Sequence, residues 1–285
     1  MYMFKDLPYE ISEKIILQIC SLTITNKFYP NRIKEVYDEE IHNMDFLFEN
    51  LNVLKTLLIQ NLIEKENVII DAQRNHNFPV LELLIEIDCF DPRAQNDQAL
   101  SYASLRNDFL MIKFLVEQGC DPRAEDDLAL TEAAGRGNLE LAKFLVEQGC
   151  DPRAQDNSAL TLAASHGHLE LAKYLVEQGC DPKARDNQAI VQSASYGYFP
   201  MVKYLIEQGC DPRARDNQAI VQAASYGYFP MVKYLIEQGC DPRAQNNRAL
   251  IQAARYNRFE MVEFLVEHGC DNNLAIREAA TNGYL

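Results

Sequence analysis

Apolar residues recur along the chain at the spacing of an amphipathic helix, and the same run returns at a fixed interval. In the run 199–208, FPMVKYLIEQ, they follow the i, i+1, i+4, i+5 pattern of one helix face. These residues are Met201, Val202, Leu205 and Ile206. On the opposite face, Lys203 and Glu207 stand four residues apart and are predicted to form an ion pair. Pro200 suits the first turn and Gly209 a left-handed C-cap, so the run predicts a helix that ends before Gly209.

A second, shorter apolar segment such as QAIVQAAS precedes each run, and a Gly or Asn separates the two. The chain therefore contains six units of equal length, 91–120, 121–150, 151–180, 181–210, 211–240 and 241–270. Self-similarity at a fixed period of roughly 20–50 residues is the signature of stacked repeats. Each unit predicts two antiparallel helices and a loop.

Six of the eight cysteines recur with the same period, at Cys120, Cys150, Cys180, Cys210, Cys240 and Cys270. A disulfide needs Cα atoms within about 7 Å, whereas equivalent positions in packed helices lie roughly 8–10 Å apart. A zinc site needs ligands at short spacings such as C-x2-C, and the chain has no such pair. The cysteines are predicted to be small core residues that pack between units.

The composition is that of a folded, acidic protein: 47% of the 285 residues are hydrophobic and the formal net charge is -15. A strongly negative surface repels phosphates, which disfavours nucleic-acid binding and docking to anionic membranes. The sequence has no apolar run of the roughly 18–20 residues that span a bilayer, and its start lacks a signal peptide. We therefore expect a reducing, cytoplasmic location and no membrane partner.

The repeated units resemble the ankyrin repeat. The family pattern of Ala-Ala, Gly-His-Leu-Glu and a Val-Lys-Leu-Leu helix is echoed by GNLELAKFLVEQGCD, residues 137–151, and by LTLAASHGHLELAKYLVEQGCD, residues 160–181. Weaker echoes occur in NFPVLELLIEIDC, residues 77–89, and LNVLKTLLIQNL, residues 51–62. The resemblance implies an all-α solenoid of stacked helix-turn-helix units. It divides the chain into an N-terminal segment 1–36, degenerate units 37–90, six repeats 91–270 and an incomplete unit 271–285.

The units depart from the family at the β-hairpin finger. A unit such as 181–210 is shorter than the family's usual unit of about 33 residues, and the missing residues fall at the tip of the finger. Prolines at 122, 152, 182, 212 and 242 also remove a backbone donor from any strand there. We expect turns in place of extended β-hairpins.

In ankyrin repeats the residues just before the break between the two helices line the concave groove that binds partners. The matching row in this chain is Arg106, Arg136, His166, Tyr196, Tyr226 and Tyr256. The residues just past the break stand at its edge, and they include His168, Tyr198, Tyr228 and Arg258. Tyr and Arg are enriched at binding hot spots, so these ten residues are the candidate site. The alternative is that the tyrosines pack over neighbouring units and only close gaps.

No pattern in the sequence predicts catalysis or a bound cofactor. His166 and His168 form an H-x-H pair without carboxylate or thiolate ligands nearby, which is a weak metal signal. Gly135-Arg136-Gly137 belongs to the break between two helices and not to a phosphate-binding loop after a strand. We therefore expect a non-catalytic protein with no metal and no cofactor.

The segment FKDLPYEISEKIILQI, residues 4–19, resembles the opening helix of an F-box, through Leu7, Pro8, Ile11 and Ile15. F-boxes bind the adaptor subunit of cullin ubiquitin ligases. The alternative is an amphipathic helix that caps the first unit. The repeated GCDPRA stretches look like those of ankyrin proteins of large DNA viruses, which would make the partner a host protein.

The sequence thus predicts a monomeric protein-binding scaffold that uses the groove. The alternative function is a substrate-recruiting adaptor of a cullin-type ubiquitin ligase.

Overall fold

The computed structural model describes residues 51–59 and 63–283, and every regular element within these ranges is an α-helix. Contacts divide the chain into two compact units, each larger than a single repeat, which we call the first unit and the second unit. The first reaches to Leu100 and includes Leu110–Cys120. The second consists of Ser101–Phe109 and the residues from Asp121 on.

The described part of the first unit is built from short helices. They are α4 (Leu51–Ile59), α5 (Lys65–Arg74), α6 (Phe78–Glu86), the start of α7 (Ala94–Leu105) and most of α8 (Phe109–Glu117). Leu81 and Ile112 are fully buried, and the rings of Phe78 and Phe114 stack with centroids 5.0 Å apart. Burial of this aliphatic and aromatic surface is the main stabilising term in the unit.

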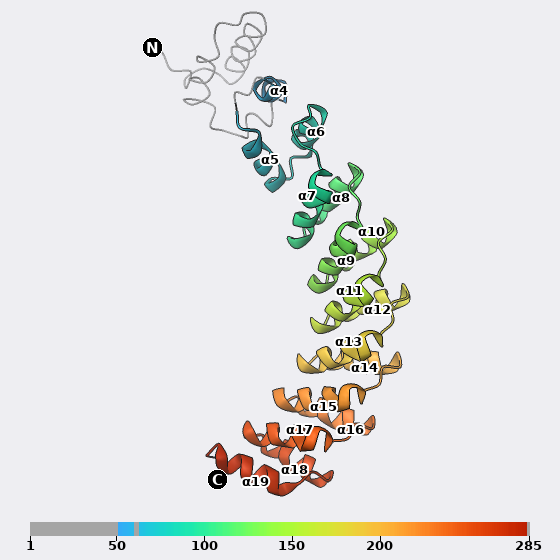
Figure 1. The fold of residues 1–285 in the computed structure, drawn as a ribbon, viewed down its shortest axis with the longest axis vertical. Helices are drawn as coiled ribbons and strands as arrows, with labels where there is room; N and C mark the ends of the chain where they lie inside the picture. Colours follow the sequence, from blue (N-terminus) through green and yellow to red (C-terminus); the bar gives the residue numbers. More distant parts are fainter. Residues whose placement is uncertain (1–50, 60–62, 284–285) are drawn as a thin grey trace, which may run out of the picture. The chain divides into compact units, whose positions relative to one another are not determined.

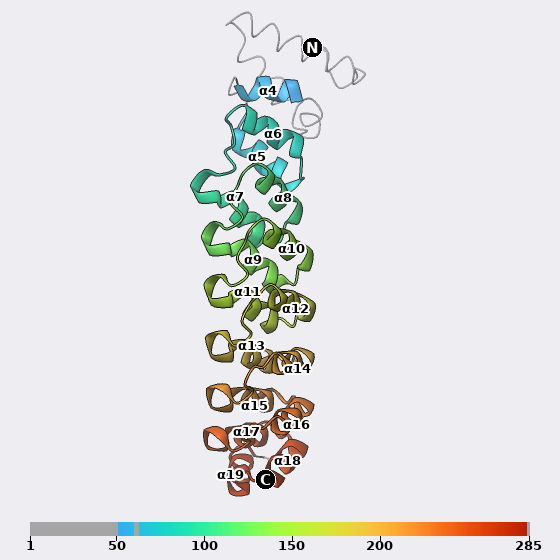
Figure 2. The same ribbon diagram turned by 90° about the vertical axis from the view of Figure 1, so that its right-hand side faces the viewer.

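The second unit repeats a pair of helices, as the sequence predicts. The first helices of the pairs are α9 (Ala124–Arg136), α11 (Ala154–Ser165), α13 (Ala184–Ser195), α15 (Ala214–Tyr226) and α17 (Ala244–Arg255). The second helices are α10 (Leu139–Glu147), α12 (Leu169–Glu177), α14 (Phe199–Glu207), α16 (Phe229–Glu237) and α18 (Phe259–Glu267), and α19 (Asn272–Thr281) follows. Each first helix contacts the next first helix, so that α9 to α17 form one layer beside the second helices (Figures 1 and 2). This confirms the all-α repeat fold.

Helix α14 shows how the sequence pattern becomes packing. Met201 and Leu205 are buried, and Gly209 takes a left-handed φ of 87° just after the helix. The predicted ion pair between Lys203 and Glu207 is wrong. The Nζ atom of Lys203 instead lies 4.4 Å from the centroid of the Phe199 ring, one helical turn earlier. A cation over an aromatic face is attracted by the ring quadrupole, and the aromatic neighbour therefore takes the place of the carboxylate.

The six periodic cysteines are free thiols and are buried, as predicted. Each Sγ donates to the proline carbonyl of the preceding loop, as from Cys180 to Pro152 O at 3.0 Å and from Cys210 to Pro182 O at 3.1 Å. Burial raises the pKa of the Cys180 thiol to about 12. Since only the thiolate is a strong nucleophile, these thiols are chemically inert in the folded protein.

Replacing Cys150, Cys180 and Cys210 together with Ala is expected to cost only about 1 kcal/mol per site, because each change removes one sulfur and one weak hydrogen bond. Urea unfolding followed by circular dichroism measures this cost. In the unmodified protein at pH 8, iodoacetamide should label the half-exposed Cys89 faster than any of the six buried thiols. Loss of helical structure in the triple variant would contradict the packing role.

The loop that replaces the family's finger is a left-handed turn. Arg185, Asp186 and Asn187 all have positive φ, at 53°, 51° and 56°, before α13 continues as a right-handed helix. The same conformation recurs at 125–127, 155–157, 215–217 and 245–247. The expected turn is therefore present, but its hand was not predicted. Consecutive left-handed residues other than Gly are unfavourable, so the turn needs compensating contacts.

Those contacts come from the next repeat. The Oδ1 atom of Asn187 accepts a hydrogen bond from the backbone N–H of Asp211 at 2.9 Å. The carbonyl of Asp186 accepts from Nε of Arg215 at 3.2 Å. An equivalent of the first bond joins each repeat from 121–150 onward to the next, with Asp127, Asn157, Asn217 and Asn247 as the other acceptors. The turns thus form a hydrogen-bonded connection that fixes the register of stacking.

Candidate partner-binding face

The ten predicted site residues fall into two rows with different surroundings, and all ten belong to the second unit. The first row, which we call the ladder, consists of Arg106, Arg136, His166, Tyr196, Tyr226 and Tyr256. The second row, which we call the stacking row, consists of His168, Tyr198, Tyr228 and Arg258. The ladder is exposed, and the stacking row is half-buried.

The ladder tyrosines stand at equivalent places near the end of the first helices. Tyr196, Tyr226 and Tyr256 are 58%, 59% and 55% exposed. The break residue that follows each has a left-handed φ, which ends the helix and leaves the tyrosine above its last turn, as at Gly197 with φ 81° and Gly227 with φ 88°. Large aromatic side chains repeated on one exposed face are typical of an interaction surface.

Each side chain of the stacking row packs on the preceding repeat. A Cβ atom on Gly167 would lie 2.4 Å from the Tyr198 ring, and one on Gly197 would lie 2.6 Å from the Tyr228 ring. Arg258 covers Gly227 in the same way and donates from Nη1 to Ser225 O at 2.6 Å. The packing interpretation therefore describes the stacking row, whereas the ladder tyrosines remain open to solvent.

The two rows also contact each other. The rings of Tyr226 and Tyr228 stack with centroids 6.3 Å apart, and the guanidinium of Arg258 lies 5.1 Å from the Tyr256 centroid. Partial burial lowers the pKa of Arg258. The stacking row therefore supports one side of each ladder ring and leaves the other parts accessible.

The other end of the ladder is less basic than its sequence indicates. The guanidinium of Arg136 forms an ion pair with Glu132 at 3.3 Å and also donates to Leu105 O. His166 bonds through Nδ1 to Leu162 O at 3.0 Å. Arg106 is exposed. The charge of Arg136 is thus partly compensated within its own helix.

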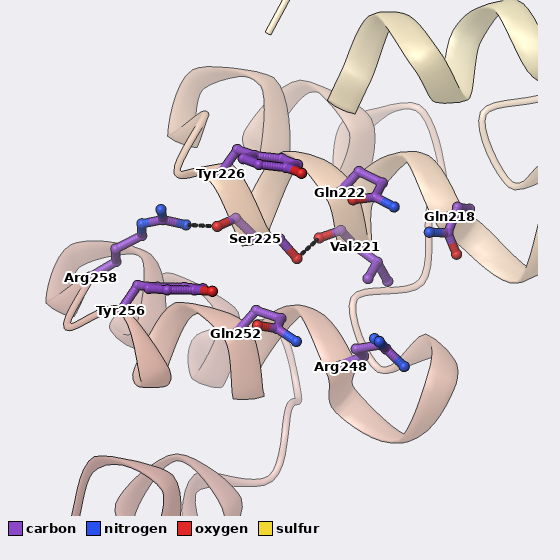
Figure 3. Close-up of a pocket in the computed structure, with 9 residues that line it drawn as sticks. All are labelled: Gln218, Val221, Gln222, Ser225, Tyr226, Arg248, Gln252, Tyr256 and Arg258. Carbon is purple, nitrogen blue, oxygen red and sulfur yellow. Dashed lines mark hydrogen bonds between the residues drawn. The ribbon is translucent and has the colours of Figure 1, made fainter. Parts of the chain in front are cut away.

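A hollow of about 420 Å³ lies between α15 and α17, beside the ladder (Figure 3). Tyr226 and Tyr256 line it at one end, with Arg258 and Ser225. Its remaining lining consists of residues that the sequence analysis missed, namely Gln218, Val221, Gln222, Arg248 and Gln252. The signal for the glutamines was present, because Gln222 and Gln252 precede the ladder tyrosines by four residues and therefore share their helix face.

The described residues contain no group of three or more His, Cys, Asp or Glu side chains that could hold a metal ion. Among the same residues, no helix is long and apolar enough to cross a membrane. The F-box-like segment with Leu7, Pro8, Ile11 and Ile15 lies outside the described residues.

Comparison with known proteins agrees with this architecture. A family model that describes ankyrin repeats (3 copies) matches residues 124–186 and again 190–276, which together make up more than half of the chain. No curated protein matches the sequence. Ankyrin repeats are generally protein–protein interaction modules, and proteins built from them are usually non-catalytic. The helix pairs, their stacking and the family match together show that this chain belongs to the ankyrin-repeat family.

Proposed function

We propose that the chain is a monomeric, non-catalytic scaffold that binds a protein partner along the ladder. The observation that supports this most is the exposure of three equivalent tyrosines, Tyr196, Tyr226 and Tyr256, at more than half of their surface each. Neighbouring repeats pack through the residue two positions later, so the exposed ladder tyrosines are not needed for that packing. The hollow beside them offers depth and hydrogen-bonding groups as well as apolar surface.

The arrangement also suits a particular polarity in the partner. Arg106 and Arg136 lie at one end of the ladder and the tyrosines at the other. A partner segment with an acidic end and an apolar end would match both. Because Glu132 partly compensates the charge of Arg136, we expect Arg106 and the tyrosines to contribute more to binding than Arg136. If the chain is viral, as the GCDPRA stretches suggest, the partner is a host protein.

Tyr226→Ala is expected to lower the affinity for the partner by roughly thirtyfold. A hot-spot tyrosine that is buried in the complex contributes about 2 kcal/mol or more, and each 1.4 kcal/mol is a factor of about ten. The partner is first captured from cell extract on the immobilised chain, and its affinity for each variant is then titrated. Stability should change little, because the side chain is 59% exposed.

Phe259→Ala is a matched control, since Phe259 on α18 is 58% exposed but stands outside the ladder. It should leave the affinity unchanged. A sharp fall in melting temperature for Tyr226→Ala with the partner still bound would show that the ladder is structural.

The second candidate function is recruitment of substrates to a cullin-type ubiquitin ligase through residues 4–19. It rests on the resemblance of Leu7, Pro8, Ile11 and Ile15 to an F-box helix. Changing Ile11 and Ile15 to Asp should abolish binding of the ligase adaptor subunit while the repeats keep their circular dichroism signal, because the change places charge on the predicted apolar face. Failure of the unmodified chain to bind the adaptor would rule this function out.

A further inference from the structure

Three consecutive first helices present the same pair of side chains, one helical turn apart. The pairs are Gln192 of α13 with Tyr196 directly after it, Gln222 and Tyr226 of α15, and Gln252 of α17 with Tyr256 directly after it. The preceding repeat differs, since Leu162 of α11 and His166 directly after it hold these places. These three Gln-Tyr pairs, which we call the stations, follow one another at one end of the ladder. A row of equal binding sites favours a ligand that is itself periodic.

The period of the stations can be compared with the periods of peptide conformations. Neighbouring packed helices lie roughly 8–10 Å apart, and the stations repeat at about that distance. Three residues of a polyproline II helix rise about 9.3 Å and return to the same face. Same-face residues of a β-strand recur only about 6.8 Å apart. The repeat distance of a polyproline II segment therefore matches the spacing of the stations, whereas that of a strand does not.

The slot between two ladder rings suits a proline ring. Figure 3 shows Tyr226 and Tyr256 edge-on, one above the other, with Arg258 and Ser225 at the base between them. Carbon atoms in contact lie about 3.5–4.0 Å apart, so two contacts to a flat ring span about 7–8 Å. A slot of roughly 8–10 Å leaves such a ring loose but fits a puckered, saturated one. Proline is the residue whose side chain has that shape.

The glutamines provide hydrogen bonds for the same ligand. Gln222 and Gln252 line the hollow, and neither side chain has a hydrogen-bond partner in the described part of the chain. A polyproline II backbone makes no internal hydrogen bonds, so its carbonyls can accept from these carboxamides. An α-helical ligand has its backbone groups already paired and would leave the glutamines without partners.

Arg248 adds a charge preference. It is exposed, it lines the hollow, and it forms no ion pair with any described residue. It precedes Tyr256 by eight residues on α17, which places it about 12 Å along the helix from the ladder. The nine lining residues include two arginines and no carboxylate. A Glu side chain of a bound segment can meet Arg248 across this distance.

We propose that the hollow between α15 and α17 recognises a polyproline II segment with proline at every third position and an acidic residue beside one of the prolines. One proline enters the slot between Tyr226 and Tyr256, and the segment continues along the ladder toward Tyr196. The glutamines bond the backbone of the segment, and Arg248 meets its carboxylate. This inference rests on the proposed function of the ladder and names the kind of segment that it binds.

The test uses the full chain and two arrays of nine-residue synthetic peptides. One array has proline at every third position with varied residues between, including Glu, and the matched array has alanine at each proline. We expect the proline peptides to bind at least tenfold more tightly than their alanine counterparts. Tyr226→Ala should remove this preference, Arg248→Gln should remove the preference for Glu alone, and Phe259→Ala should change neither.

Equal binding of both arrays, or no Tyr226-dependent binding by any proline peptide, overturns the inference. Tighter, Tyr226-dependent binding of an amphipathic helical peptide also overturns it, because the ladder would then take a helix. The proposed function is tested separately by partner capture. If replacing the three ladder tyrosines with Ser abolishes capture while the proline peptides do not bind, the ladder function stands and only the inferred ligand is wrong.

Discussion

Gly167→Ala should lower the free energy of unfolding by about 2–5 kcal/mol, although it adds a single methyl group. The new Cβ atom would lie 2.4 Å from the ring of Tyr198, so the ring has to leave its place on the preceding unit. Overpacking of this kind costs about 1–3 kcal/mol. The φ of 77° at Gly167 adds roughly 1–2 kcal/mol for any residue with a Cβ. Urea unfolding followed by circular dichroism measures the sum.

Gly179→Ala separates the two causes. Its φ is 96°, and a Cβ there meets nothing within 4 Å, so this variant should show only the backbone cost of roughly 1–2 kcal/mol. Adding Tyr198→Ala to Gly167→Ala should recover part of the loss, because the overlapping ring is gone. Equal destabilisation by Gly167→Ala and Gly179→Ala would contradict the packing role of the stacking row.

Asn217→Val should destabilise the protein by about 3 kcal/mol through the left-handed turn. The Oδ1 atom of Asn217 accepts from the backbone N–H of Asp241 at 2.8 Å, and loss of this bond leaves a donor without a partner, at about 1–3 kcal/mol. The φ of 57° at Asn217 is also unfavourable for a β-branched side chain. Thermal and urea unfolding of the full chain measure the effect.

Two matched variants identify the cause. Asn217→Asp reproduces the arrangement of Asp127, whose carboxylate accepts from Asp151 N–H at 3.1 Å, and should cost less than about 1 kcal/mol. Asn217→Gly keeps the left-handed backbone but loses the acceptor, and should fall between the other two. If valine were tolerated as well as aspartate, the turn would not fix the stacking of units.

The repeated pattern was sufficient to predict the helix pairs, their ends and the burial of the cysteines. The fixed period places each Cys and each Gly at the same point of its unit, and local rules for helix faces and caps then apply. Lys203 shows the limit of such local rules. Its aromatic neighbour Phe199 is as close along the helix as Glu207, and sequence spacing does not decide between the two.

The left-handed turns could not be predicted, because their stability lies in contacts between units. Arg185, Asp186 and Asn187 contain no glycine, and three left-handed residues in succession are unfavourable without one. The backbone of Asp211, in the following unit, binds the side chain of Asn187 and helps to hold the turn. The recurring Asp or Asn at this place was the available signal, since both residues tolerate the left-handed region.

The same reasoning explains what was found of the site. The resemblance to ankyrin repeats indicated the rows on both sides of the break, but it could not separate the exposed Tyr196 from Tyr198, which covers Gly167. That distinction depends on the direction of each side chain in the stacked repeats. The glutamines were missed because only the residues next to the break were chosen as candidates, and Gln222 and Gln252 lie one helical turn before them.

Radical footprinting of the chain with and without its captured partner tests the central claim most directly. Oxidation by hydroxyl radicals, read by mass spectrometry, reports the exposure of each aromatic side chain. In the free chain, Tyr196, Tyr226, Tyr256 and Phe259 should all react, because each is more than half exposed. In the complex, the three ladder tyrosines should be protected while Phe259 reacts as before. Undiminished oxidation of the ladder tyrosines in the complex would show that the partner binds elsewhere and would contradict the account.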